Sequence, residues 1–509
     1  MYYPALILLL VSFAWTCLRV LLSETTSRSS GKLPPGPRPF PVVGNIFSLS
    51  SKPHVSLADL SKTYGPVMSL KLGTITSVVI SSPQAAREAL QKHDRALSGR
   101  TVTDSVRALR HHEASVVWLP ESATRWRELR KICALQLFSP QRLEAGRALR
   151  REKVREIVDH VGERCRSGTA VDIGEAAFTT TLNLLSNTIF SVDLATYDSE
   201  RSQEFMGLVR SVMEEAGVLN LADYFPALRW IDPQGARRRT TVYARKLLGI
   251  FDEIINQRLA ARGSSSSKEN SPARNVDVLD ALLDLSKEPS DYELSCDDMK
   301  HLFLDLFVAG TDTTSSTVEW AMAELLCHPE VMARAQAELK QISDQDDKDK
   351  GEIKIIEESE ISKLPYLQAV VKETFRLHPP VPFLVPHKAE ASVEIMGYRV
   401  PKGAQVLVNV WDVGHNADTW ERPNSFSPER FLSPEAADVK GMDFELIPFG
   451  AGRRICPGLP LAQRMVHVML ASLMGRFEWK LGGEELDMEE KYGITLRKAE
   501  PLRAIPIQS

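Results

Sequence analysis

The sequence has few cysteines, and none of them forms a closely spaced pair. Six cysteines are spread over 509 residues. A zinc site would need several clustered ligands, and a small secreted domain would be held by a dense set of disulfides. The scattered cysteines therefore argue against a disulfide scaffold and favour a reducing compartment.

An excess of basic residues and internal repeats are also missing. The 62 lysines and arginines nearly balance the 66 acidic residues, and a net charge of −4 gives no reason to expect a nucleic-acid partner. We find no period that would indicate a solenoid. With 43% apolar residues, the chain can bury a large core. Its length allows several domains or one large catalytic domain.

No basic side chain precedes the apolar run at the start of the chain. Pro4–Leu22 is nearly continuous and about long enough to span a bilayer. A cleaved secretory signal usually has a basic start and a small-residue cleavage site. Here Arg19, Arg28 and Lys32 all follow the apolar core. The positive-inside rule then predicts a retained anchor with most of the chain in the cytosol.

These features predict three parts. Residues 1–22 are a transmembrane anchor, residues 23–41 a polar and proline-rich linker, and residues 42–509 a single catalytic domain. The prolines of Lys32–Pro41 favour a stiff extended connector. Gly263–Arg274 is a second flexible stretch, which we expect to separate two helices and not two domains.

Apolar periodicity predicts a mainly α-helical domain with small β-sheets. Val67–Ile80 is rich in β-branched residues around a glycine, which indicates a short hairpin. The adjacent His111 and His112 have no distal ligand nearby, and we interpret them as part of a solvated loop. Helices are expected over Pro83–His93, Ser122–Phe138, Leu143–Cys165, Ile173–Phe190, Ser202–Ala216, Arg237–Arg262, Ser295–His328, Leu364–His378 and Leu459–Phe477.

One cysteine, Cys456, has an unusual setting. It stands among the glycines and arginines of Phe449–Gly458, directly before an apolar helix pattern. Unpaired N–H groups at a helix N-terminus favour a thiolate, and Arg453 and Arg454 are expected to act in the same direction. A lone thiolate is a poor zinc site but a good axial ligand for haem iron. The alternative is a buried cysteine in a tight turn.

The pattern Phe-x-x-Gly-x-Arg-x-Cys-x-Gly resembles the haem-binding loop of the cytochrome P450 family. The resemblance implies that Cys456 is the axial ligand of haem b, that Arg454 contacts a haem propionate and that Phe449 packs near the thiolate. Trp126 and Arg130, four residues apart on one helix face, match the Trp-x-x-x-Arg motif that contributes to a propionate contact.

Ala309–Thr314 places glycine beside several threonines inside a long helix pattern. Such residues are poor helix formers and tend to bend helices, so a packing kink is one interpretation. The stretch also resembles the oxygen-activation motif of the same family. That resemblance implies that Asp312 and Thr313 guide the protons that O–O cleavage requires. The small Ala309 and Gly310 would leave room for oxygen and substrate.

Three charged residues match a further family motif. Glu373 and Arg376, three residues apart, would alone be an ordinary surface ion pair. Together with Arg430 in the Pro-Glu-Arg-Phe sequence, they resemble the structural triad behind the haem. His387 stands where many relatives place an arginine against a propionate. The sequence departs from the family there, so His387 is a candidate for that contact by position alone, and the sequence leaves the contact open.

The residues that line the substrate pocket can be predicted only from the positions that line it in members of the cytochrome P450 family. The residues expected to line it are apolar and uncharged, which suits a lipophilic substrate. Phe444–Arg454 and Leu486–Leu496 look most like plant members near the geraniol hydroxylases and ferruginol synthases, which implies a terpenoid substrate. Phenolic, flavonoid or alkaloid substrates are alternatives. The expected lining residues are Val106, Val117, Leu306, Ala309, Val381, Phe383 and Ile494.

The resemblance covers essentially the whole chain and implies the cytochrome P450 fold and a monooxygenase reaction. Electrons would come from NADPH-cytochrome P450 reductase in the same endoplasmic reticulum membrane, in which this chain would be single-pass. The sequence has no dinucleotide fingerprint or flavin domain, so the reductase is expected to be a separate protein. A peroxide isomerase or dehydratase and a haem sensor are rival interpretations, and neither needs the acid–alcohol pair at Asp312 and Thr313.

Overall fold

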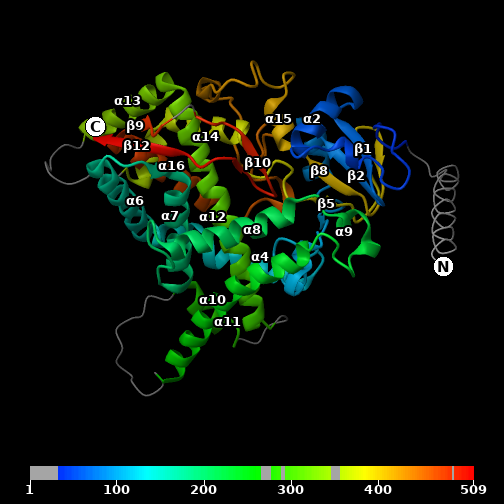
Figure 1. The fold of residues 1–509 in the computed structure, drawn as a ribbon, viewed down its shortest axis with the longest axis horizontal. Helices are drawn as coiled ribbons and strands as arrows, with labels where there is room; N and C mark the ends of the chain where they lie inside the picture. Colours follow the sequence, from blue (N-terminus) through cyan, green and yellow to red (C-terminus); the bar gives the residue numbers. More distant parts are fainter. Residues whose placement is uncertain (1–31, 265–276, 288–292, 346–355, 484–485, 509) are drawn as a thin grey trace, which may run out of the picture.

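The computed structural model describes residues 32–264, 277–287, 293–345, 356–483 and 486–508 (Figure 1). The chain is mainly helical, with short strands gathered into small sheets, as the sequence predicts. The predicted anchor at residues 1–22 lies outside the described residues, as does most of Gly263–Arg274. Among the helices that are described, none combines the length and the apolar content needed to cross a bilayer.

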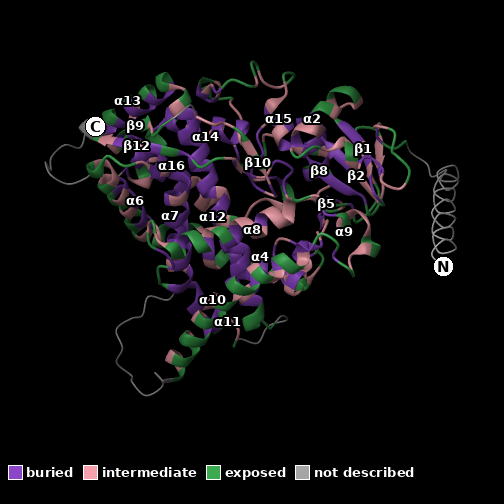
Figure 2. Cartoon of the chain, viewed as in Figure 1, coloured by how far each residue is buried: buried purple, intermediate pink, exposed green. Residues whose placement is uncertain are grey.

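The longest helix, α12 (Cys296–Cys327), runs through the middle of the molecule. Its N-terminus is fixed by a reciprocal capping box, in which the Ser295 hydroxyl accepts from the backbone N–H of Asp298 while the Asp298 carboxylate accepts from Ser295. The helix contacts α7 (Ile173–Phe190) most extensively and also contacts several other helices. Figure 2 shows it buried along most of its length.

The other helices surround α12, and several begin with proline in the first turn, where its missing N–H costs little. The predicted helix over Ser122–Phe138 is α-helical only to Ile132 and ends in a π-helical turn. The remaining α-helices are α2 (Pro53–Tyr64), α3 (Pro83–Arg87), α4 (Thr124–Ile132), α5 (Pro140–Ala145), α6 (Arg147–Ser167), α8 (Glu200–Gly217), α9 (Leu221–Tyr224), α10 (Ala236–Ser264), α11 (Val278–Leu285), α13 (Pro329–Gln345), α14 (Pro365–Leu377), α15 (Val410–His415) and α16 (Leu459–Arg476).

Short 3-10 and π segments connect these helices. Two are π-helical and extend the helices before them, whereas the others are 3-10 turns. They are η1 (Ile46–Ser48), η2 (Glu88–Lys92), η3 (Ser105–Glu113), η4 (Cys133–Leu137), η5 (Pro226–Leu228), η6 (Glu358–Lys363), η7 (Pro428–Phe431) and η8 (Gly452–Arg454).

The largest sheet has the strand order β1-β2-β8-β5-β3. The predicted hairpin is confirmed, because β1 (Val67–Leu72) and β2 (Ile75–Ile80) pair antiparallel around Gly73, whose φ is 57°. At the other edge, β5 (His387–Lys388) pairs with β3 (Gly99–Arg100), and Arg100 lies opposite His387. The other strands are β4 (Val171–Asp172), β6 (Val393–Ile395), β7 (Tyr398–Val400), β8 (Gln405–Val408), β9 (Phe477–Leu481), β10 (Glu490–Tyr492), β11 (Leu496–Lys498) and β12 (Arg503–Gln508).

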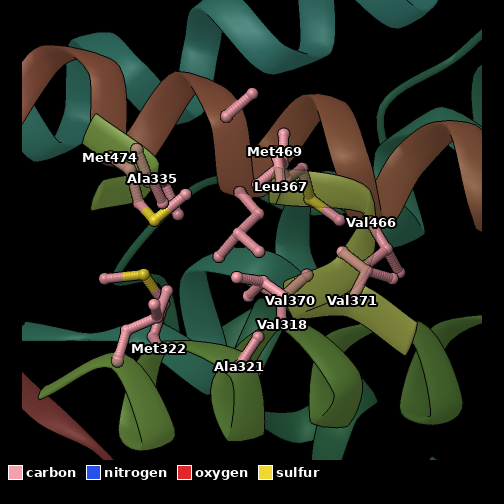
Figure 3. Packing of buried hydrophobic residues seen from close by; sticks show 14 of the residues in the cluster. Val318, Ala321, Met322, Ala335, Leu367, Val370, Val371, Val466, Met469 and Met474 are labelled. Carbon is pink, nitrogen blue, oxygen red and sulfur yellow. The ribbon is translucent and has the colours of Figure 1, made fainter. Parts of the chain in front are cut away.

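The main core joins α12 to α13, α14 and α16 (Figure 3). Val318 of α12 lies beside Val370 of α14, and Met322 of α12 points towards Met474 of α16 in the same cluster. Each fully buried side chain of this size contributes roughly 1.5–3 kcal/mol. The core thus fixes α16, and the cysteine loop before it, relative to α12.

The sequence predicts a linker over residues 23–41. The part of this linker that the structure describes packs against the catalytic domain. The backbone N–H of Ser69 in β1 donates to the Pro35 carbonyl at 2.8 Å, and the Ser69 hydroxyl donates to Pro34 at 2.6 Å. The Asn45 amide donates to the carbonyls of Pro37 and Arg38, each at 3.2 Å. All of these contacts are made by backbone carbonyls of the stretch, whose prolines have no N–H to offer.

Candidate active site

The loop that carries Cys456 is held in a tight turn directly before α16. The backbone N–H of Cys456 donates to the Phe449 carbonyl at 3.0 Å. Gly450 and Gly452 have φ values of 71° and 64°, in the left-handed region that favours glycine. A Cβ at position 452 would lie 2.1 Å from the Leu90 carbonyl oxygen, so only glycine fits there. The loop therefore presents its cysteine in one fixed position.

Burial raises the pKa of the Cys456 thiol, and the N–H groups of Gly458 and Leu459 together with Arg130 lower it without outweighing burial. The backbone N–H groups at the N-terminus of α16 therefore lower the pKa of the thiol, as the sequence predicts. The expectation that Arg453 and Arg454 favour the thiolate is wrong, because Arg130 is the arginine that acts on it. Coordination to a metal ion would deprotonate such a thiol outright.

Arg453 and Arg454 point to different surroundings. Arg453 is half-exposed and its Nε lies 2.9 Å from an Asp94 carboxylate oxygen. Arg454 donates from Nε to the Ser98 carbonyl at 2.9 Å and from Nη2 to the Leu119 carbonyl at 2.5 Å. Its Nη1 is buried and has no hydrogen-bond partner.

Arg454 belongs to a group of three half-buried arginines. Arg100 donates from Nη1 to the Val385 carbonyl at 2.6 Å, and its buried Nε has no hydrogen-bond partner. Arg130 donates to the Ile455 carbonyl. Burial, with repulsion from Arg454 and Arg130, lowers the pKa of Arg100, and burial, with repulsion from Arg130, lowers that of Arg454 to about 10. The three cations are thus held close to one another.

Trp126 and His387 complete the surroundings of these arginines. The Trp126 indole N–H donates to the Val116 carbonyl at 3.0 Å, and its ring lies under the Arg454 guanidinium, 4.5 Å from centroid to Cζ. The Trp126 ring therefore supports Arg454 through a cation–π contact. Nδ1 of His387 lies 2.7 Å from the Leu97 carbonyl and must carry the proton that bonds to it. Burial and two neighbouring arginines hold the pKa of His387 well below its usual value.

A dianionic ligand would match this group of arginines. Within the part of the chain that the structure describes, no carboxylate lies within ion-pair distance of Arg100, Arg130 or Arg454. Unpartnered buried N–H groups cost free energy unless a ligand satisfies them. Two carboxylates such as haem propionates would supply the missing acceptors and charge. Sequence reasoning missed Arg100, because a single arginine in an aperiodic stretch carries no signal.

The acid–alcohol pair lies in the middle of α12. Asp312 is buried, and its Oδ2 accepts from the Thr495 hydroxyl at 2.6 Å while its Oδ1 lies 3.8 Å from Nε of Arg210. The Thr313 hydroxyl donates to the Ala309 carbonyl at 2.7 Å. Ala309 is exposed and Thr313 half-buried, on a helix that is otherwise largely buried. Thr495 and Arg210 were not predicted from sequence.

Gly310 serves helix packing. A Cβ at this position would lie 3.0 Å from a methyl group of Leu185 in α7. The missing side chain therefore allows α7 and α12 to approach closely, a role that the sequence does not reveal. α12 runs continuously through the whole stretch from Cys296 to Cys327.

A cleft lies between α9, η5 and the strands of the large sheet. Two of the predicted pocket residues, Phe383 and Ile494, line it together with Trp118 and other apolar side chains. Asp223 and Arg229 also line it. The other predicted pocket residues lie elsewhere: Val117 and Leu306 pack in the cluster that also contacts Ile494, Val106 is buried, Val381 is half-buried and Ala309 is exposed on α12.

The structure brings the three charges of the predicted triad together. The Arg376 guanidinium donates to the Glu373 carboxylate at 2.7 and 2.8 Å, and Arg430 Nε donates to the same carboxylate at 3.0 Å. Arg376 also donates to the carbonyls of Gly414 and Pro423. Glu373 and Arg376 are fully buried. This network ties α14 to the segment that leads into the cysteine loop.

The prediction of a solvated loop around His111 is wrong. Nε2 of His111 lies 3.0 Å from an Asp305 carboxylate oxygen, and its Nδ1 lies 2.8 Å from Nδ1 of His301. Asp305 also accepts from the Ser115 hydroxyl and from the Val116 N–H. The buried Asp305 carboxylate of α12 fixes this loop. Asp305 and Ser115 are 190 residues apart in the sequence, so the sequence pattern gave no sign of their contact.

Comparison with known proteins relates the chain to one protein family. The family described as cytochrome P450 matches residues 34–503. The chain is 53% identical over 511 residues to cytochrome P450 monooxygenase 76AD131 of Lophophora williamsii, covering 99% of each protein. It is 52% identical to geraniol 8-hydroxylase of Catharanthus roseus, covering 94% of this chain and 95% of that protein, and 49% identical to geraniol 8-hydroxylase of Swertia mussotii, covering 97% of each.

Proposed function

The chain belongs to the cytochrome P450 family and is a monooxygenase, and from this premise we propose that it hydroxylates a terpenoid alcohol of about monoterpene size. The observation that carries the proposal is the near full-length identity to two proteins that are named for geraniol 8-hydroxylation. The apolar lining of the cleft at Phe383, Trp118 and Ile494 supports a lipophilic substrate that is oriented mainly by shape.

The family implies a haem-thiolate cofactor, and the residues of this chain fit one. Cys456 would be the axial ligand, with Phe449 packed beside it. The unpartnered nitrogens of Arg100 and Arg454 support a role in holding the propionates, and Arg130 lies in the same group. The predicted contacts of Trp126 and His387 are included in this proposal, Trp126 acting through Arg454. When bound, a haem-thiolate supplies the oxidising power for O–O cleavage and oxygen insertion.

The protein's own part in the reaction is to position the substrate and control protons. We assign the proton supply to Asp312 and Thr313. The Thr495 hydroxyl fixes one oxygen of the Asp312 carboxylate, and Arg210 lies near the other. Thr313 donates to a backbone carbonyl of its own helix, and its hydroxyl oxygen can accept a second hydrogen bond. The Glu373, Arg376 and Arg430 network would hold the scaffold behind the cofactor.

The proposal includes a redox partner and a membrane. We assign the electron supply to NADPH-cytochrome P450 reductase, and we place the protein in the endoplasmic reticulum membrane as a single-pass protein anchored by residues 1–22, with residues 42–509 in the cytosol. The full-length similarity to plant proteins of the same family supports this. The apolar Pro4–Leu22 followed by basic residues is the sequence feature on which the anchor rests.

Product analysis tests the proposal. Microsomes that contain the full-length protein and a plant reductase would receive NADPH and either geraniol, a sesquiterpene, an abietane diterpene olefin or a flavonoid. We expect an NADPH-dependent hydroxylated product from geraniol. A Cys456→Ser variant should lose both that product and the carbon monoxide band that is typical of a thiolate ligand.

Three outcomes would redirect the proposal. Oxidation of the flavonoid alone would favour the phenolic class of substrates over terpenoids. Conversion of a hydroperoxide without NADPH would favour the interpretation of the protein as a peroxide isomerase. Haem binding without any turnover, together with a normal thiolate band, would favour a sensor.

A further inference from the structure

The cleft described above contains two opposite charges that do not pair with each other. Asp223 is at the end of α9, and Arg229 directly follows η5. Both line the cleft together with Phe383 and Ile494. No ion pair within 4.0 Å joins Asp223 to Arg229, although both residues belong to the described part of the chain. The cleft is lined mostly by apolar side chains, with some neutral polar ones such as Thr101, Thr103 and Gln405, and Asp223 and Arg229 are the charged residues among those that line it.

One hydrogen bond holds the carboxylate of Asp223, and two more hold the backbone next to it. Its Oδ1 accepts from the backbone N–H of Asp104 at 2.5 Å. The carbonyl of Tyr224, the next residue, accepts from the backbone N–H and from the hydroxyl of Thr74, each at 2.9 Å. These bonds dock α9 on the β1–β2 turn, near which Figure 1 draws it. Burial raises the pKa of Asp223 to about 6, so the group is mostly ionised at neutral pH.

Arg229 is fixed by its backbone and by one nitrogen of its side chain. Its Nε donates to the Ala222 carbonyl at 3.2 Å, and its own carbonyl accepts from Arg237 at 2.8 Å. Among the described contacts, its remaining guanidinium nitrogens have no carboxylate partner within 4.0 Å. They are donors that a ligand can use.

Two other residues that line the cleft adjoin segments of the proposed reaction centre. Ile494 lines the cleft, and the next residue, Thr495, donates its hydroxyl to Asp312. Leu384 also lines the cleft, and its Cδ1 would lie 3.6 Å from a Cβ added at Gly450 of the cysteine loop. A ligand in this cleft would thus contact Asp223 and Arg229 and also two residues that adjoin the proton-supplying segment and the cysteine loop.

We propose that Asp223 and Arg229 bind the hydroxyl group of the substrate and thereby select which carbon is oxidised. A hydroxyl can donate to the carboxylate and accept from the guanidinium, so one alcohol satisfies both side chains. The apolar chain then extends towards Ile494, and the end of the substrate remote from its hydroxyl is presented for reaction. This inference rests on the proposed function, because it assumes a terpenoid alcohol.

The same pair of side chains predicts which compounds should bind less tightly than an alcohol. A hydrocarbon would bury Asp223 and Arg229 and leave their remaining acceptor and donors without a ligand partner, which costs free energy. A carboxylic acid would be attracted by Arg229 but repelled by Asp223. A methyl ether can accept from Arg229 but cannot donate to Asp223. Discrimination between an alcohol and its methyl ether therefore isolates the contribution of Asp223.

Equilibrium binding to the holoenzyme tests the inference. Dissociation constants would be measured by spectral titration with geraniol, geranyl methyl ether and the hydrocarbon myrcene. A hydrogen bond to a charged group contributes enough for roughly a ten-fold preference or more for geraniol over the ether. Asp223→Leu and Asp223→Asn should reduce that preference, Asp223→Leu the more strongly. Arg229→Met should weaken the binding of alcohol and ether alike.

Controls separate this inference from the proposed function. Asp59→Asn neutralises an exposed acid of α2 and should leave the preference unchanged. The carbon monoxide spectrum reports whether each variant holds haem normally, and Asp223→Asn keeps the shape of the side chain if Asp223→Leu fails to fold. Equal affinity of the wild type for geraniol and its ether, with geraniol still hydroxylated, would overturn the inference alone. Absence of both binding and turnover for every terpenoid alcohol would overturn the proposed function as well.

Discussion

At the scale of single residues, the arginines near Cys456 are placed where they repel one another. Arg100, Arg130 and Arg454 are half-buried, and two of them have a buried nitrogen without a hydrogen-bond partner. Proteins rarely leave buried polar groups unsatisfied unless a ligand or a functional demand accounts for them. An arrangement that is unfavourable alone becomes favourable when an anionic group binds. Its stability should therefore depend on the cofactor.

We predict that Arg100→Leu weakens haem retention without destabilising the apoprotein. The substitution removes one donor to the proposed propionates and also relieves repulsion among the arginines. Haem per protein after gel filtration should fall by several-fold, on the order expected for one charge-assisted hydrogen bond. The unfolding midpoint of the apoprotein should stay the same or rise.

Arg453→Leu is the matched control for this prediction. Arg453 adjoins Arg454 in sequence but pairs with acidic side chains near the surface. Its removal should leave haem retention close to the wild-type level. Equal loss of haem in the two variants would contradict a specific role for Arg100.

A second prediction concerns the hydroxyl that holds Asp312. Thr495→Val keeps the shape of the side chain but leaves one oxygen of a buried carboxylate without its donor at 2.6 Å. Positioned proton transfer contributes about 10²–10⁴-fold to catalysis, so kcat should fall by about ten-fold or more while geraniol affinity changes little. Thr495→Ser restores the hydroxyl and should restore the rate. A larger solvent isotope effect in Thr495→Val would identify the loss with proton delivery, whereas an unchanged rate would refute it.

At the scale of elements, the network around Glu373 and Arg376 connects α14 to η7. Glu373 and Arg376 are fully buried, and a Cβ at Gly414 would lie 2.2 Å from the Arg376 carbonyl oxygen, so the backbone there is tightly packed. Removal of one partner from a buried ion pair leaves an uncompensated charge. The cost should therefore exceed that of an exposed pair.

We predict that Glu373→Gln destabilises the protein by about 3–5 kcal/mol, the range for breaking a buried pair. Arg334→Ala is the control, since Arg334 pairs with the half-exposed Glu429 at 2.8 Å and should cost only about 0–1 kcal/mol. Denaturant unfolding of both variants measures the difference. Similar losses of unfolding free energy in the two variants would show that the buried network stabilises the protein no more than the exposed ion pair does.

Elements were easier to predict from the sequence than contacts between them. The cysteine loop and the α12 motif are local patterns, so their residue types could be read within a few positions. Thr495 reaches Asp312 across 183 residues, and the residues that separate them give no sign of the contact. Arg100 was missed for the same reason. Helix periodicity also could not predict the π-helical end after α4, since that depends on packing and not on the apolar pattern.

At the scale of the whole molecule, His378 joins three distant parts of the chain. It lies directly after α14, and its ring stacks on Trp320 of α12 at 4.0 Å. Its Nε2 donates to Glu324 of α12 at 2.6 Å, and its Nδ1 lies 3.6 Å from Glu490 of β10. The charge on one imidazole thus contributes to how the C-terminal strands are held against the central helix.

The pKa shifts of this cluster fix the sign of its pH dependence. Burial lowers the pKa of His378, but its contacts with Glu324 and Glu490 outweigh burial and raise it above 6.5. Burial raises the pKa of Glu490, but the hydrogen bond with His54 and the nearby imidazole of His378 outweigh burial and hold that pKa well below 4.5. The contribution of His378 is therefore complete below pH 6.5 and lost as pH rises through its folded pKa. That of Glu490 is present above pH 4.5 and lost on acidification.

We predict that stability is greatest between these limits and that His378→Gln flattens the alkaline side of the profile. Each unit by which the folded pKa exceeds 6.5 contributes about 1.4 kcal/mol, so the variant should be least stable relative to the wild type near pH 6. The difference should shrink as pH rises, because the wild-type imidazole then loses its proton. Unfolding midpoints of both proteins from pH 5 to pH 9 measure this. Parallel profiles would mean that His378 joins the chain segments through packing alone and that its charge plays no part.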